Sequence, residues 1–205
     1  MEFSLTITII ILTAVISFSA FGNPKVINDL IFWPPKISKH HQYYRFITSG
    51  FIHADIAHLA FNMITLYFFG RVVEEFYVDR IGKGGYLFFY AFGIICSEIP
   101  SYIKNYNNYQ YRSLGASGAV TAVLFSFILL SPWSTLLVFF IPMPAIIFAV
   151  LYLVYTTYMS KKGGDYINHS AHLWGAIYGV IVTIIIEPNI ISAFIYQLQH
   201  PRFNF

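Results

Sequence analysis

The sequence predicts an all-α, polytopic membrane protein, a bundle of six transmembrane helices that forms a single domain over residues 1–205. Composition is the first reason, because 57% of the 205 residues are hydrophobic, only 10% are charged, and the mean hydropathy is +0.63. An ordinary water-facing surface carries more charge than this. The second reason is the length of the uncharged runs, since about 20 apolar residues in a helix cross a hydrocarbon core about 30 Å thick.

Breaks between these runs divide the chain into spans. No Asp, Glu, Lys or Arg occurs from Ser113 to Ser160, a stretch too long for one crossing, so Pro132 is taken to separate the fourth and fifth spans. Pro188 ends the sixth span, because proline cannot continue a helix. Pro142 and Pro144 are expected to kink the fifth. The predicted spans are about 4–21, 56–76, 85–102, 115–131, 134–155 and 170–187, with a long first loop over 22–55 that is expected to pack at the membrane interface.

Alternating direction brings polar side chains from three spans to one face of the membrane. The second, fourth and sixth spans run the same way, so their N-terminal ends lie together. His58 and Asn62 occupy the first two turns of the second span, Ser117 opens the fourth, and His172 opens the sixth. Polar groups inside lipid are costly unless they face one another, and they are usually functional. We therefore expect these four residues to form a site.

The serine stands in a setting that suits a nucleophile. Gly115-Ala116-Ser117-Gly118 joins a loop to a helix, where the backbone approaches a substrate closely and N–H groups remain unpaired. A serine hydroxyl needs a base within hydrogen-bond reach, and an imidazole fills that role well at neutral pH. The pattern predicts Ser117 as the nucleophile and His172 as its base.

The remaining polar and small residues supply donors and close packing. Asn62 and His58 are four residues apart, so they share one helix face and could donate to the oxyanion of a tetrahedral intermediate. Gly175 and Gly179 form a small-xxx-small pattern that permits close helix contact. If this pattern meets Gly118, the two helices bring the serine and the histidine together.

The acidic residues suggest a dyad. None of the four aspartates has an obvious place beside His172, and Asp165 in the preceding loop comes nearest. Glu98, near the end of the third span, is expected to pair with Lys104, although it could also touch substrate or water.

These motifs resemble the rhomboid intramembrane serine proteases over nearly the whole chain. The resemblance rests on His58-Leu-Ala-Phe-Asn62, Gly115-Ala-Ser117-Gly118 and His172-Leu-Trp-Gly175 with Gly179, in this order on the expected spans. It implies a Ser117–His172 dyad, an oxyanion hole made by Asn62, His58 and the Ser117 N–H, and cleavage of transmembrane segments of protein substrates. Thr121 departs from the family, since many members carry there an aromatic residue that stacks on the histidine.

Other functions fit the sequence less well. The basic residues are scattered and the net charge is only +3, which argues against nucleic-acid binding. The histidines near the catalytic face leave a metal site open as an alternative, but no H-E-x-x-H motif is present. A transporter would need polar residues deeper in the membrane. The histidines in question are His53, His58, His169 and His172.

The expected protein is a multi-pass membrane protein, placed in the cell membrane, that acts on transmembrane protein substrates within the bilayer. The proposed chemistry calls for no metal and no organic cofactor. The chief alternative is a non-catalytic rhomboid-like protein that binds transmembrane segments. The sequence does not indicate an oligomeric state.

Overall fold

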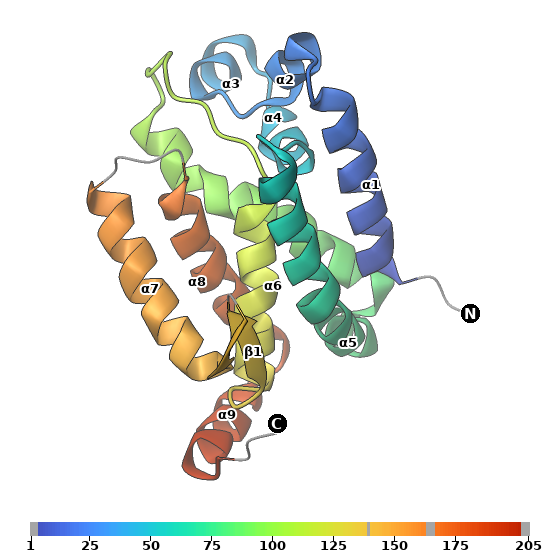
Figure 1. The fold of residues 1–205 in the computed structure, drawn as a ribbon, viewed down its shortest axis with the longest axis vertical. Helices are drawn as coiled ribbons and strands as arrows, with labels where there is room; N and C mark the ends of the chain where they lie inside the picture. Colours follow the sequence, from blue (N-terminus) through green and yellow to red (C-terminus); the bar gives the residue numbers. More distant parts are fainter. Residues whose placement is uncertain (1–3, 139, 163–166, 202–205) are drawn as a thin grey trace.

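A bundle of helices surrounds one buried central helix. The computed structural model describes residues 4–138, 140–162 and 167–201. Every residue of α6 from 118 to 129 is buried, and Figure 1 shows this helix in the middle of the bundle. The helices of the bundle are α1 (Leu5–Ala20), α5 (Ile56–Lys104), α6 (Ser117–Leu130), α7 (Ala145–Lys162) and α8 (His169–Ile186).

Helix α5 consists of two helical halves joined at a kink. Gly82 has φ 73° and ψ 173°, a left-handed conformation that glycine adopts without steric cost, and the regular helix is interrupted there. The halves, 56–81 and 83–104, contain the predicted second and third spans. Asp55 caps the first half, because its side chain accepts a hydrogen bond from the His58 N–H.

The long first loop is folded. It contains α2 (Pro24–Leu30), α3 (Pro34–His40), α4 (Arg45–Thr48) and a 3₁₀ turn, η1 (Ser49–Phe51). Pro24 and Pro34 begin their helices, a position that suits the fixed φ of proline. The buried Arg45 guanidinium donates to the backbone oxygens of Asn28 and Ile31, so this side chain ties α4 to the C-terminal part of α2.

The predicted fifth span, 134–155, is not helical over its first half. β1 (Thr135–Val138) and β2 (Ile141–Pro144) form an antiparallel hairpin, and α7 starts only at Ala145. Pro142 and Pro144 therefore lie in a strand and do not kink a helix. The residue before a proline avoids the helical region, so two prolines spaced by one residue keep this stretch extended.

A further helix that the sequence analysis did not predict, α9 (Ile190–Gln199), follows Pro188. The Trp133 indole N–H donates to the Gln197 carbonyl at 2.7 Å, and the Gln197 amide donates to the Leu130 carbonyl at 3.2 Å. These bonds attach α9 to the C-terminal end of α6.

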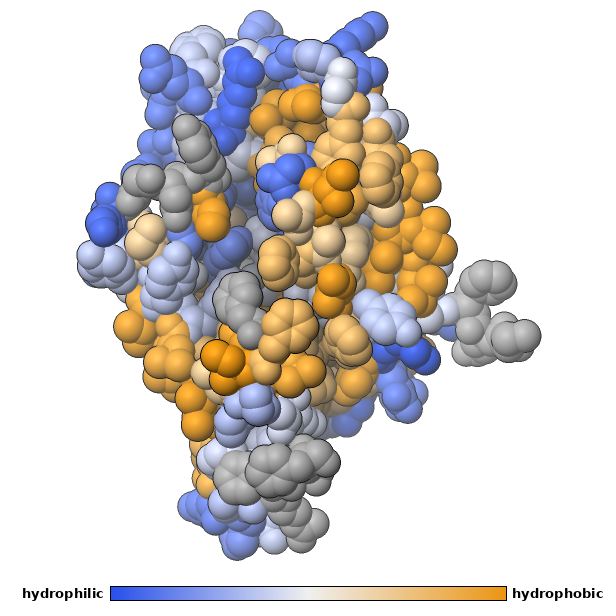
Figure 2. All heavy atoms as spheres, in the orientation of Figure 1, coloured by the Kyte–Doolittle hydropathy of each residue, from blue (hydrophilic) through white to orange (hydrophobic). Residues whose placement is uncertain are grey.

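The hydrophobic surface is consistent with a membrane protein. Figure 2 shows an apolar band across the middle of the visible face, with hydrophilic residues gathered over α2 and α3 at one end and near α9 at the other. Among the described residues, two helices are both long and apolar enough to cross a membrane, Ile56–Lys104 and His169–Ile186. Helices α1 and α6 are apolar but shorter.

Candidate active site

The N-terminal ends of α5, α6 and α8 lie at the same end of the molecule, the upper end in Figure 1. Ser117 is the first residue of α6, and His172 lies in the first turn of α8. His58 and Asn62 lie in the first two turns of α5. All four predicted site residues are thus at one end of the bundle.

Helices α6 and α8 touch through backbone at small residues. A Cβ atom built on Gly175 would collide with the carbonyl group of Gly118, and one built on Gly179 would collide with the Ala122 carbonyl. A Cβ atom on Gly118 would lie 3.5 Å from the Ala171 carbonyl oxygen. Ser117 and His172 directly adjoin these contact residues, so the crossing brings their two helix turns together.

The start of α6 offers free backbone donors. The N-cap residue, Ala116, has no side chain that could cap the helix, and the first N–H groups of any helix have no partner within it. Together with the positive end of the helix dipole, they favour negative charge beside Ser117. This is the environment that an oxyanion needs.

His58 packs directly against the loop before the serine. Gly115 has φ +119°, and a Cβ atom placed on it would lie 2.7 Å from His58 Cε1 and 2.9 Å from Nε2. Asn62 is buried, and its side-chain amide donates to the His58 carbonyl at 3.0 Å, which leaves its second N–H for another acceptor. His58 therefore contacts the loop that carries Ser117, and Asn62 lies one turn further along the same helix.

His53, not among the predicted catalytic residues, fixes the backbone next to Ser117. Its Nε2 accepts from the Ala116 N–H at 3.3 Å, so its Nδ1 carries the proton and donates to Ser17 Oγ at 2.9 Å. Ser17 Oγ donates in turn to the Phe51 carbonyl at 2.9 Å. This relay needs a neutral imidazole. Burial, and after it the nearby His58, lowers the pKa of His53 to about 3 against a smaller opposing effect of Asp55.

Two further contacts attach the same loop to the folded first loop. Phe32 and Ser113 exchange backbone hydrogen bonds of 3.0 and 3.2 Å, and the Gly115 N–H donates to the Ser49 carbonyl at 2.9 Å. The first loop therefore holds the approach to Ser117 in place. Of the residues that hold the loop before Ser117, only His53 could be suspected from the sequence, because it lies five residues before His58.

Glu98 connects the approaches to both candidate catalytic residues. It is 6% exposed, and its carboxylate accepts from Ser113 Oγ at 3.0 Å and from the Asn168 side-chain amide at 3.0 Å. Asn168 caps α8 by accepting from the Ala171 N–H, and also from Ser101 Oγ. The expected pairing of Glu98 with Lys104 is thus replaced by neutral partners near Ser117 and His172.

Two rings contact the imidazole of His172. Tyr152 of α7 stacks on it with centroids 6.2 Å apart and planes 18° apart, and His169 meets it edge-on at 5.9 Å. Asp165, the acid nearest to His172 in sequence, lies outside the described residues.

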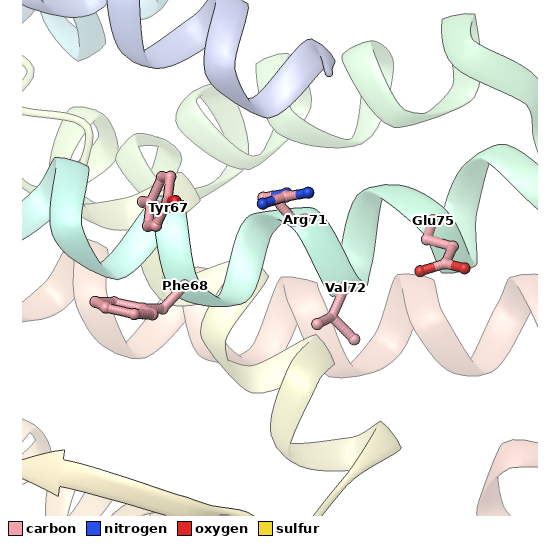
Figure 3. Close-up of a pocket in the computed structure, with 5 residues that line it drawn as sticks. All are labelled: Tyr67, Phe68, Arg71, Val72 and Glu75. Atoms are coloured by element: carbon pink, nitrogen blue, oxygen red, sulfur yellow. The ribbon is translucent and has the colours of Figure 1, made fainter. Parts of the chain in front are cut away.

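The histidines do not assemble as metal ligands in the part of the chain that the structure describes, where no three His, Cys, Asp or Glu side chains come together in that way. His53 illustrates the reason, since both of its ring nitrogens are already hydrogen-bonded. A pocket of about 360 Å³ lies away from the site. Figure 3 shows its lining residues along a single stretch of α5, namely Tyr67, Phe68, Arg71, Val72 and Glu75.

The chain is similar in sequence to several known proteins. The chain is 34% identical over 147 residues to RHOMBOID-like protein 12, mitochondrial, of Arabidopsis thaliana, which covers 66% of the chain and 44% of the relative. It is 36% identical over 83 residues to Rhomboid protease GluP of Bacillus subtilis, covering 40% of the chain and 15% of that protein. It is 29% identical over 140 residues to the human Presenilin-associated rhomboid-like protein, mitochondrial, covering 65% and 35%.

These relatives are longer than the chain, which spans less than half the length of each. Two of them carry mitochondrial names, so the expected cell-membrane location has no support from them. The model of the Rhomboid domain matches residues 40–189, which include all four predicted site residues. On this match the chain belongs to the rhomboid family.

Proposed function

We propose that the chain is an intramembrane serine protease that cleaves transmembrane segments of other proteins. Ser117 Oγ attacks the scissile carbonyl while His172 takes the serine proton. The tetrahedral intermediate collapses to an acyl-enzyme as the imidazolium gives its proton to the leaving amine. Water then attacks the acyl group, with His172 as base, and restores the free serine.

The oxyanion of each tetrahedral intermediate is assigned to three donors. These are the backbone N–H at Ser117, the second side-chain N–H of Asn62 and the His58 ring. Removal of one such donor typically costs on the order of 10²–10³ in rate. The uncapped start of α6 and the contact of His58 with Gly115 support this assignment.

The same proposal includes six membrane crossings, made by α1, the two halves of α5, α6, α7 and α8. Two of these helices meet the length and hydropathy expected of a span, and the apolar band in Figure 2 supports the others. A 14-residue helix such as α6 rises only about 21 Å, which is less than the hydrocarbon core of about 30 Å. Its N-terminal end, which carries Ser117, can therefore lie below the membrane surface and still open to water. Water would reach Ser117 from the loop end.

One observation carries the proposal, the backbone contact of Gly118 with Gly175 that joins the two helix turns bearing Ser117 and His172. The test is cleavage of a single-span model substrate in liposomes, together with labelling by a fluorescent serine-directed phosphonate. Ser117→Ala is expected to abolish both, and His172→Ala to reduce both at least 10³-fold.

Matched controls are available on the surface. Ser19→Ala and His200→Ala remove an exposed serine and an exposed histidine and are expected to retain cleavage. Cleavage by Ser117→Ala at the wild-type rate would refute the proposal.

A second candidate is a protein that binds transmembrane segments without hydrolysis, and the rhomboid-like names of two relatives favour it. One experiment distinguishes the two candidate functions. Photocrosslinking of the model substrate to the wild type, with neither cleavage nor phosphonate labelling, would establish binding alone.

A further inference from the structure

Tyr152 is placed to orient the candidate base. Its ring lies nearly parallel to that of His172, with planes 18° apart and centroids 6.2 Å apart. Aromatic rings attract in offset-stacked arrangements at about 4.5–7 Å between centroids. An imidazole that leans on such a face loses part of its freedom to rotate.

The Tyr152 ring is itself held from α6. Its hydroxyl lies 3.2 Å from Thr121 Oγ1, within hydrogen-bond distance, and Thr121 is one turn after Ser117. The ring also contacts Phe125 of α6 at 5.8 Å and Phe148 of α7 at 5.4 Å between centroids. The position of the Tyr152 ring is thus fixed relative to α6, the helix that carries the nucleophile.

The aromatic ring on His172 comes from another helix in this chain, which carries Thr121 where many rhomboid family members carry an aromatic residue. The residue there is too small to stack on an imidazole, yet its hydroxyl fixes an aromatic ring that arrives from another helix. From the contact between these three side chains we infer that Tyr152 is a positioning residue for His172, and that Thr121 positions Tyr152. The inference rests on the proposed function, in which His172 acts as the base.

Tyr152 belongs to α7, which links the orientation of His172 to the position of that helix. Helix α7 lies at the edge of the bundle in Figure 1 and meets the protein along a narrow strip whose buried members are Ala145, Ala149 and Thr156. Tyr152 belongs to this strip, at the i+3 position from Ala149. The orientation of His172 therefore depends on the position of α7. Most of the other α7 side chains are exposed, including Ile147, Val150, Leu151, Val154, Tyr155 and Tyr158.

Kinetics on the full chain in liposomes test the role. Tyr152→Leu removes the aromatic face and is expected to lower kcat about tenfold, the size of one aromatic contact, with KM within about twofold. Tyr152→Phe keeps the face and is expected to retain at least about one third of kcat. Tyr158→Leu is the matched control, because it removes an exposed aromatic residue from the same helix.

A double-mutant cycle tests the part played by Thr121. Thr121→Val removes the hydroxyl at nearly constant shape, and its effect on kcat is expected to match that of Tyr152→Phe. The double variant should be no worse than either single one, because both break the same hydrogen bond. Additive losses would overturn the assignment of Thr121.

Proton NMR of the detergent-solubilised protein gives a readout that does not need activity. The Tyr152 ring current is expected to shift the His172 Hε1 resonance, assigned by its loss in His172→Ala, and Tyr152→Leu should abolish that shift while Tyr158→Leu preserves it. Should Tyr152→Leu not fold, Tyr152→Met replaces it as the variant without a ring.

The outcomes separate the inference from the proposed function. An active wild type with an unchanged kcat in Tyr152→Leu, or with only KM raised, would overturn the positioning role and leave the protease intact. A wild type that neither cleaves nor reacts with the phosphonate would overturn the protease, and the NMR shift would still decide whether the stack exists.

Discussion

Gly175 of α8 faces the Gly118 carbonyl group of α6 so closely that a Cβ atom on Gly175 would lie 2.9 Å from the carbonyl carbon. The atoms in contact are backbone, which cannot rotate away as a flexible side chain could. The distance between the helices that carry Ser117 and His172 is therefore set by the absence of one methyl group.

Gly175→Ala is expected to push α6 and α8 apart. Overpacking of this kind costs about 1–3 kcal/mol, and a misplacement of about 1 Å at a catalytic pair lowers rate by about 10²-fold. Thermal unfolding in detergent and substrate cleavage measure the two effects. Gly84→Ala is the control, since nothing lies within 4 Å of its added carbon. Equal melting temperatures for the two variants would contradict the close contact.

Gly115→Ala is expected to impair the proposed oxyanion hole. The substitution places a methyl group against the His58 ring at a backbone conformation, φ +119°, that residues with a Cβ atom rarely adopt. We expect kcat to fall at least about tenfold, because both His58 and the N–H groups near Ser117 must shift. Gly22→Ala separates the two causes, as Gly22 also has a positive φ, +73°, but no neighbour within 4 Å. A similar kcat in the two variants would exclude the His58 collision as the cause.

Glu98→Ala is expected to loosen the approaches to Ser117 and His172 together. It leaves Ser113 and Asn168 without their acceptor in a buried setting, at a cost of about 1–3 kcal/mol for each unsatisfied group. Glu98→Gln should stay near wild type, because its oxygen can accept from Asn168 while its amide donates to the Ser113 hydroxyl. Chemical denaturation in mixed micelles compares them. Equal losses in the two variants would show that the negative charge matters rather than the hydrogen bonds.

The stability of the protein is expected to fall on acidification partly through His53, which precedes α5 and lies outside the proposed spans. Its pKa in the folded protein is lowered to about 3 by burial and by His58, from an ordinary value of 6.5. Below pH 6.5 the unfolded chain therefore binds a proton that the folded chain does not, and stability drops as pH falls toward 3. Above pH 6.5 the group has no effect on the pH dependence.

His53→Gln tests this assignment because glutamine does not titrate. From pH 6.5 to pH 5 the wild type should lose up to about 2 kcal/mol more stability than the variant does. Unfolding monitored by tryptophan fluorescence at the two pH values gives the difference. An identical pH slope in wild type and variant would mean that His53 is not the group that titrates.

Much of the fold could be predicted because the relevant signals are local. Runs of apolar residues mark the helices, and Gly82 and Pro132 mark the turns between them. The hairpin formed by Thr135–Val138 and Ile141–Pro144 is harder to predict, because the high hydropathy of this stretch also fits a membrane span. Only Pro142 and Pro144 indicate strands, through the extended conformation that prolines impose on the residues before them.

The sequence alone determined which residue types stand at the N-terminal ends of three helices that run in the same direction, and hence that Ser117, His172, His58 and Asn62 share one end of the bundle. It did so because helix length and direction follow from runs of about 20 residues. Tertiary structure alone decided that Tyr152 supports His172, that Glu98 binds Ser113 and Asn168, and that His53 holds the backbone at Ala116. The ring stack and the hydrogen bonds behind these three arrangements join residues up to 70 positions apart, and only the packing of whole helices sets which side chains meet.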